Sequence, residues 1–173
     1  MNDELLAAAE HLERYGYCLL EDRIPAAQAH AMAADFLQLH ADPKYAQYIS
    51  GDEHYQTLFG MLNYDERVWQ CAFHADTVAI GRHLLGPRCR VVEACSKPCW
   101  PGAPAQNLHV DSAGNFHQVP DVPWMINTIW MLSDFTAANG GTGIVPMSHR
   151  SRLKSPPPEV GPDSPLIKAL SDR

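Results

Sequence analysis

The residues with the clearest chemical potential in this chain are His109 and Asp111, which stand two positions apart in Leu-His-Val-Asp. Side chains at positions i and i+2 of an extended strand point to the same face, so an imidazole and a carboxylate at this spacing can bind one metal ion together. A second histidine would complete the 2-His-1-carboxylate set that holds non-haem Fe(II) and leaves positions open for substrate. We therefore expect His109 and Asp111 to be metal ligands.

Two further histidines follow this pair, but neither has the features of the missing ligand. His117 lies in the polar stretch Gly-Asn-Phe-His-Gln, where we expect it to line a pocket or to face solvent. His149 ends the segment Pro-Met-Ser-His, and we expect it to hold the turn after Val145 rather than to bind metal. The sequence therefore leaves the third ligand unidentified.

Length and charge narrow the class of protein. The 173 residues, 46% of them hydrophobic, are enough for one domain with its own core. The 13 basic and 20 acidic residues give a net charge of -7, which disfavours nucleic acid and anionic membranes as partners. We expect a small-molecule substrate and make no prediction of the oligomeric state.

The N-terminus and the cysteines favour a cytoplasmic protein. The first residues have no basic region followed by an apolar stretch, and no apolar run reaches membrane-spanning length. The five cysteines are odd in number and scattered, which fits reduced thiols better than a disulfide framework. Cys95 and Cys99 have no second Cys/His pair at the spacing of a zinc site.

The first half of the chain has helical patterns. A helix is predicted over residues 3–15, with Asp3 as its cap and Gly16 as its end. Pro25 opens a second helix, whose apolar stripe is formed by Ala29, Met32, Ala33, Phe36 and Leu39. Residues 65–85 are predicted to form a third helix that ends at Gly86-Pro87, and residues 41–62 are expected to be mostly loop.

The second half has strand patterns. Strands are predicted over residues 17–21, 90–95, around His109, over 124–132 and over 142–145. Asn139-Gly140-Gly141 predicts the hairpin turn before the last of these strands. The chain is therefore expected to be one α+β domain, with a helical part over about residues 1–88 and strands over about residues 89–173.

An ordered series of motifs resembles the phytanoyl-CoA dioxygenase family of Fe(II)- and 2-oxoglutarate-dependent oxygenases. The opening Glu-Arg-Tyr-Gly-Tyr and the later Leu-Leu-Gly-Pro resemble the first half of that family. More specific is the order His-Val-Asp, Leu-Ser-Asp-Phe-Thr, Asn-Gly and Ile-Val-Pro-Met-Ser-His-Arg. The resemblance covers nearly the whole chain.

The resemblance implies a double-stranded β-helix, the cupin-like jelly roll, with His109 and Asp111 as the first two iron ligands. It implies oxidative decarboxylation of 2-oxoglutarate to succinate and CO2, coupled to hydroxylation of a small organic molecule. Because Asp111 keeps its carboxylate, halogenation is disfavoured. Asn127 and Trp130 are candidates for contacts with the cosubstrate. Beyond the metal ligands, no catalytic residue is predicted.

One part of the family pattern is not found. The family's distal histidine, and the arginine about ten residues later that binds the far carboxylate of 2-oxoglutarate, lie well beyond the Pro-x-Ser-His segment. Only 24 residues follow His149 here. We therefore expect the jelly roll to lack its C-terminal strands.

Three interpretations remain open on the sequence alone. In the first, the chain is the N-terminal part of an oxygenase whose activity resides in the full-length protein, and the chain by itself is inactive. In the second, it is a catalytically inactive cupin-like protein that binds a metal or a small molecule. In the third, it is another metalloenzyme, for instance a zinc enzyme, that completes its site across a dimer interface. The identity of the substrate is not fixed by the sequence.

Overall fold

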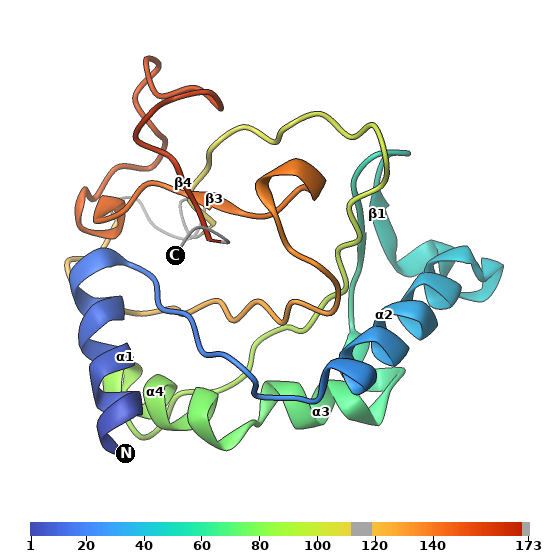
Figure 1. The fold of residues 1–173 in the computed structure, drawn as a ribbon, viewed down its shortest axis with the longest axis horizontal. Helices are drawn as coiled ribbons and strands as arrows, with labels where there is room; N and C mark the ends of the chain where they lie inside the picture. Colours follow the sequence, from blue (N-terminus) through green and yellow to red (C-terminus); the bar gives the residue numbers. More distant parts are fainter. Residues whose placement is uncertain (112–118, 171–173) are drawn as a thin grey trace.

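The computed structural model of the chain describes residues 1–111 and 119–170, which combine helices with two small sheets (Figure 1). This is an α+β arrangement, as predicted. The α-helices of the described residues are α1 (Asp3–Tyr15), α2 (Ala26–Ala41), α3 (Glu66–Ala72) and α4 (Ala75–Leu85). The strands are β1 (Ile49–Gly51), β2 (Gln56–Leu58), β3 (Gly143–Ile144) and β4 (Lys168–Ala169). Within these residues no helix has the length and apolar character needed to cross a bilayer.

Helix α1 has the predicted bounds but a different cap. The side-chain oxygen of Asn2, and not that of Asp3, accepts a hydrogen bond from the Leu5 backbone N–H at 2.9 Å. Asp3 instead lies in the first turn, where its charge faces the positive end of the helix dipole. The helix ends at Gly16, whose backbone N–H donates to the Leu12 carbonyl. Helix α1 packs against α4.

Helix α2 follows Pro25, as predicted, and turns an apolar stripe toward the core. Ala29, Met32 and Phe36 are buried, whereas Ala33 and Leu39 are only half-buried. The stripe continues instead to His40, which is also buried.

The prediction of one helix over residues 65–85 is wrong, because α3 and α4 are separate helices. The chain leaves the helical path at Phe73 and His74. The His74 side chain accepts a hydrogen bond from the Asp76 backbone N–H, and so provides α4 with a cap of its own. Apolar spacing alone did not reveal this break.

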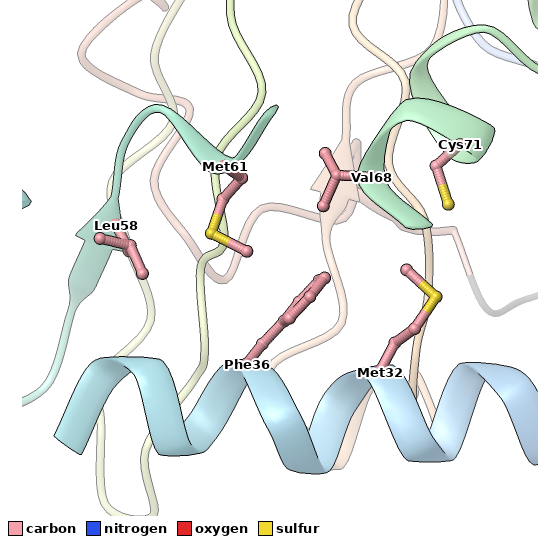
Figure 2. Close-up of a cluster of buried hydrophobic side chains, with 6 residues drawn as sticks. All are labelled: Met32, Phe36, Leu58, Met61, Val68 and Cys71. Carbon is pink, nitrogen blue, oxygen red and sulfur yellow. The ribbon is translucent and has the colours of Figure 1, made fainter. Parts of the chain in front are cut away.

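The core lies between α2 and the elements that face it. Figure 2 shows the two side chains of α2 pointing toward side chains from the end of β2, from the 3₁₀ turn Met61–Asn63 and from α3. The buried cluster consists of Met32, Phe36, Leu58, Met61, Val68 and Cys71. Two residues of the later extended segment, Trp130 and Leu132, pack against this cluster. The core therefore fixes part of the segment that approaches the predicted metal site.

The segment 41–62, predicted to be mostly loop, contains a small hairpin. Strands β1 and β2 pair antiparallel, with Ser50 opposite Thr57. Leu58 then exchanges two backbone hydrogen bonds of 3.0 Å with Ser96. The hairpin thereby ties the loop after residue 95 to the core.

The predicted strands at 17–21, 90–95, around His109 and at 124–132 are not regular strands among the described residues. A strand is stable only when a neighbour satisfies its backbone N–H and C=O groups. No backbone-to-backbone hydrogen bond within the described part of the chain joins residues 125–132 to a neighbouring segment. Within the described residues, the segment 125–132 therefore has the side-chain pattern of a strand without a backbone partner.

The predicted hairpin at Asn139-Gly140 is also wrong. Residues 137–139 form a 3₁₀ turn in which the Asn139 side chain accepts from the Thr136 N–H and donates to the Asp134 carbonyl, both at 2.7 Å. Gly140 follows with φ 89°, and its α-carbon lies close to the thiol of Cys99. The strand after the turn, β3, pairs with β4 and not with residues 124–132.

Candidate metal centre

The structure brings the side chains of His109 and Asp111 together. His109 Nε2 lies 3.0 Å from Asp111 Oδ1, although neither residue belongs to a regular strand. Leu108 and Val110 are half-buried, whereas His109 and Asp111 are exposed, so the backbone here keeps the alternation of an extended chain. The two side chains are 63% and 50% exposed. A contact between such exposed side chains adds little to stability.

The other ring nitrogen of His109 has a defined partner. Nδ1 lies 3.0 Å from the backbone carbonyl oxygen of Asn107. A carbonyl only accepts hydrogen bonds, so Nδ1 must carry the proton and donate. In the neutral ring Nε2 then presents its lone pair, and metal-binding histidines are commonly held by such a contact on their second nitrogen.

The separation of Nε2 and Oδ1 has two chemical explanations. Without a metal, a hydrogen bond from Nε2 to the carboxylate requires a proton on Nε2 as well. With a metal, the ion takes the place of that proton. Donor atoms about 3.0 Å apart would be close enough to bind one metal ion together. The donor types, imidazole nitrogen and carboxylate oxygen, also suit Fe(II).

The second oxygen of the carboxylate is bound by a residue from another segment. Asn127 Nδ2 donates a hydrogen bond to Asp111 Oδ2. The two oxygens of Asp111 therefore have different environments, one facing the imidazole and one facing a neutral amide.

The other residue considered for the cosubstrate, Trp130, lies against the core. Its ring is 5.5 Å from the ring of His74, and it packs on the buried cluster of Figure 2. Trp130 and Leu132 are half-buried, while Asn127, Ile129 and Met131 are exposed. The extended segment thus turns one side to the core and the other, with Asn127, toward Asp111.

Residues 12–163 match the sequence profile of the family described as phytanoyl-CoA dioxygenase (PhyH). The chain belongs to the phytanoyl-CoA dioxygenase family. A curated relative, dioxygenase af480 of Aspergillus fumigatus, is 26% identical to it over 170 residues. That alignment covers 90% of this chain and 52% of the relative, so the chain spans about half the length of the relative. No solved structure matches the chain.

Within the described residues of this phytanoyl-CoA dioxygenase family member, His109 and Asp111 are the pair that the sequence predicts as metal ligands. No third histidine, cysteine, aspartate or glutamate within residues 1–111 and 119–170 joins His109 and Asp111 in a metal-binding group. His117, considered above as a ligand, lies outside the described residues. The two residues predicted as ligands thus lie side by side, and their role as metal ligands stays a prediction.

His149 has a structural role in this family member. Its Nε2 donates to the carbonyl oxygen of Glu13 at 3.0 Å, and Arg150 donates to the same oxygen at 2.6 Å. The Met147 backbone N–H donates to the Tyr15 carbonyl at 2.8 Å. These contacts satisfy the carbonyls of Glu13 and Tyr15 at the end of α1, where the charge of Arg150 also matches the helix dipole.

Two contacts of a buried histidine were not predicted. His40 is buried at the end of the α2 stripe, with Nδ1 3.3 Å from Gln56 Oε1 and Nε2 3.2 Å from Ser96 Oγ. Burial lowers the pKa of His40, so the ring is kept neutral. The four-residue spacing between Phe36 and His40 could have predicted that His40 lies on the buried face of α2.

The cysteines, all among the described residues, are free thiols, as predicted.

Proposed function

We propose that this chain carries the metal-binding part of an Fe(II)- and 2-oxoglutarate-dependent dioxygenase. The reaction is hydroxylation of a small organic molecule, coupled to oxidative decarboxylation of 2-oxoglutarate to succinate and CO2. The observation that carries the proposal is the convergence of His109 Nε2 and Asp111 Oδ1 at 3.0 Å, with Nδ1 held by the Asn107 carbonyl. Membership of the phytanoyl-CoA dioxygenase family supports it.

The fold that we propose for the complete active protein is the double-stranded β-helix. Its support is the alternating exposure of residues 107–111 and 129–132, which have strand-like sides but no regular pairing among the described residues. In a jelly roll, partner strands would satisfy the backbone groups of these segments.

Each residue of the site has a distinct task in this proposal. His109 and Asp111 bind the ion through Nε2 and Oδ1, and the Asn107 carbonyl fixes the ring tautomer. Bound iron, together with 2-oxoglutarate and dioxygen, supplies the oxidising power of the reaction. The high exposure of both ligand side chains leaves space on the metal side for a third ligand and for the cosubstrate.

Metal binding by the purified chain tests the ligand pair. Titration with Co(II), a spectroscopic substitute for Fe(II), should show one saturable site by calorimetry and visible absorption. His109→Ala and Asp111→Ala should each abolish or strongly weaken it, whereas His30→Ala, an exposed histidine on α2, should not. Equal binding by the wild-type chain and both ligand variants would overturn the proposal.

Turnover tests the oxygenase chemistry separately. With Fe(II), ascorbate and 2-oxoglutarate, the protein extended to the length of its relative should form succinate, and the Asp111→Ala variant should not. Succinate formation that is independent of Asp111 would exclude the proposed site as its source.

A second function is favoured by one observation, namely that no third donor joins the two proposed ligands among the described residues. A cupin-like protein that binds a metal or a small molecule without catalysis would meet this description. It predicts saturable Co(II) binding with no succinate formed by the extended protein. A zinc enzyme completed across a dimer interface predicts instead that protein purified without added metal contains zinc and is dimeric.

A further inference from the structure

Both carboxylate oxygens of Asp111 are in contact with side chains, one from a neighbouring residue and one from a distant segment. Oδ1 faces the imidazole of His109, two residues away, at 3.0 Å. Oδ2 accepts the hydrogen bond of the Asn127 side-chain amide, sixteen residues away in sequence. A carboxylate that is fixed at one oxygen cannot rotate freely about its Cβ–Cγ bond, so the Asn127 contact determines which oxygen faces the imidazole.

From this geometry we propose that Asn127 is a positioning residue, which holds Asp111 in the orientation that binds metal through Oδ1. The inference rests on the proposed metal site and differs from the sequence-based prediction that Asn127 contacts the cosubstrate. Partners that orient a ligand from outside the metal's own coordination sphere commonly change metal affinity by about 10- to 100-fold when they are removed.

The chemistry of an amide suits this task. A lysine or arginine at the same place would neutralise the carboxylate and compete with the cation for it. The amide of Asn127 donates a hydrogen bond without a charge, so Asp111 retains its attraction for the ion. Aspartate at position 127 would have nearly the same shape but no donor, and it would bring a second negative charge next to Asp111.

The position of Asn127 depends on the core. Trp130 and Leu132, in the same extended segment, pack against the buried cluster of α2, β2 and α3 (Figure 2). Trp130 also lies beside the ring of His74, at the start of α4. The side of the segment that faces the core is thereby fixed, and the alternation of side chains leaves Asn127 on the other side. The orientation of Asp111 is thus tied to packed residues rather than to its own exposed loop.

The test measures Co(II) affinity and the visible spectrum of the bound ion in the absence of 2-oxoglutarate. Asn127→Ala should weaken Co(II) binding about 10- to 100-fold and alter the absorption bands, because the carboxylate no longer keeps one orientation. Asn127→Gln keeps an amide donor at an exposed position and should retain more affinity than Asn127→Ala. Thr128→Ala, at the neighbouring exposed position, is the matched control and should bind as the wild type does. The thermal unfolding midpoint should be the same in all four proteins.

Each other result has a definite meaning. Wild-type affinity and spectrum in Asn127→Ala, with binding still lost in His109→Ala, would overturn the positioning role and leave the proposed function in place. Unchanged Co(II) affinity together with weakened 2-oxoglutarate binding would overturn it in favour of a direct cosubstrate contact. Absence of His109-dependent metal binding in the wild-type chain would overturn both proposals.

Discussion

His149 donates from Nε2 to the carbonyl oxygen of Glu13 at 3.0 Å, and so joins the end of the first helix to a turn 136 residues later. Gly16 makes this approach possible, because a β-carbon at that position would lie 2.6 Å from His149 Nδ1. Arg150 donates to the same carbonyl oxygen. His149, in a segment that resembles the family's pattern, therefore serves to dock α1.

The shared acceptor predicts non-additive effects of the two donors. His149→Ala and Arg150→Ala should each lower the free energy of unfolding by less than about 1 kcal/mol, since one donor remains. The double variant should cost at least about 0.5 kcal/mol more than the sum, because the carbonyl then loses both donors. Urea denaturation of the four proteins measures this coupling. Co(II) affinity should be unchanged in His149→Ala, and its loss would instead assign His149 to the metal.

Gly140 and Gly102 form a matched pair for testing close packing at the 137–141 turn. Both have positive φ, 89° and 84°, but a β-carbon on Gly140 would lie 2.5 Å from Cys99 Sγ, whereas one on Gly102 would meet nothing within 4 Å. Gly102→Ala should destabilise the protein by about 1 kcal/mol through its backbone alone. Gly140→Ala should cost more, and adding Cys99→Ala should recover part of the difference. If thermal unfolding shows that the two single variants lose the same stability, the contact with the Cys99 thiol does not contribute to stability.

His40 predicts a pH dependence of stability. Burial lowers its pKa below the ordinary value of about 6.5, so the unfolded chain takes up a proton that the folded chain resists. The stability due to the neutral ring is complete above that value and declines as the pH falls from about 6.5 toward the lower pKa of the folded state. His40→Gln should flatten this part of the stability curve, whereas His30→Gln, at an exposed position of the same helix, should not. Urea midpoints between pH 5 and pH 8 provide the measurement.

Trp130 predicts a stability effect through the core. Because its ring packs on the buried cluster and beside His74, Trp130→Ala should lower the free energy of unfolding by about 3 kcal/mol. Trp130→Phe should lose less, since it keeps an aromatic ring. A variant with normal stability and weakened 2-oxoglutarate binding would instead support a direct contact with the cosubstrate.

The helices show where local sequence is sufficient. The bounds of α1 followed from Gly16 and from a run of helix-forming residues, and α2 followed from Pro25 and its four-residue apolar spacing. Both signals act within one or two turns of chain. The break between α3 and α4 was missed because a histidine side chain caps the second helix, and apolar spacing contains no information about that contact.

The strands show where local sequence is insufficient. Residues 124–132 have strong strand propensity, but a strand forms only with a neighbour, and propensity does not specify one. Strand β3 was expected to return from a hairpin and pairs with β4 instead. At the site, His109 and Asp111 could be paired from spacing alone, whereas the bond from Asn127 to Asp111 depends on tertiary structure across sixteen residues.

Residues 125–132 have no backbone partner within the described residues, and this has a consequence for hydrogen exchange. Amides protected by the core, such as those of Leu58 and Ser96, exchange only when the surrounding structure opens. Residues 125–132 have packed side chains on one side, yet no backbone partner within the described part of the chain. The backbone amides of residues 125–132 should exchange with deuterium within the shortest labelling times. The side chains of the same segment that pack on the core should stay packed during this exchange. An exchange map of this chain would therefore separate side-chain burial from backbone protection along a single segment.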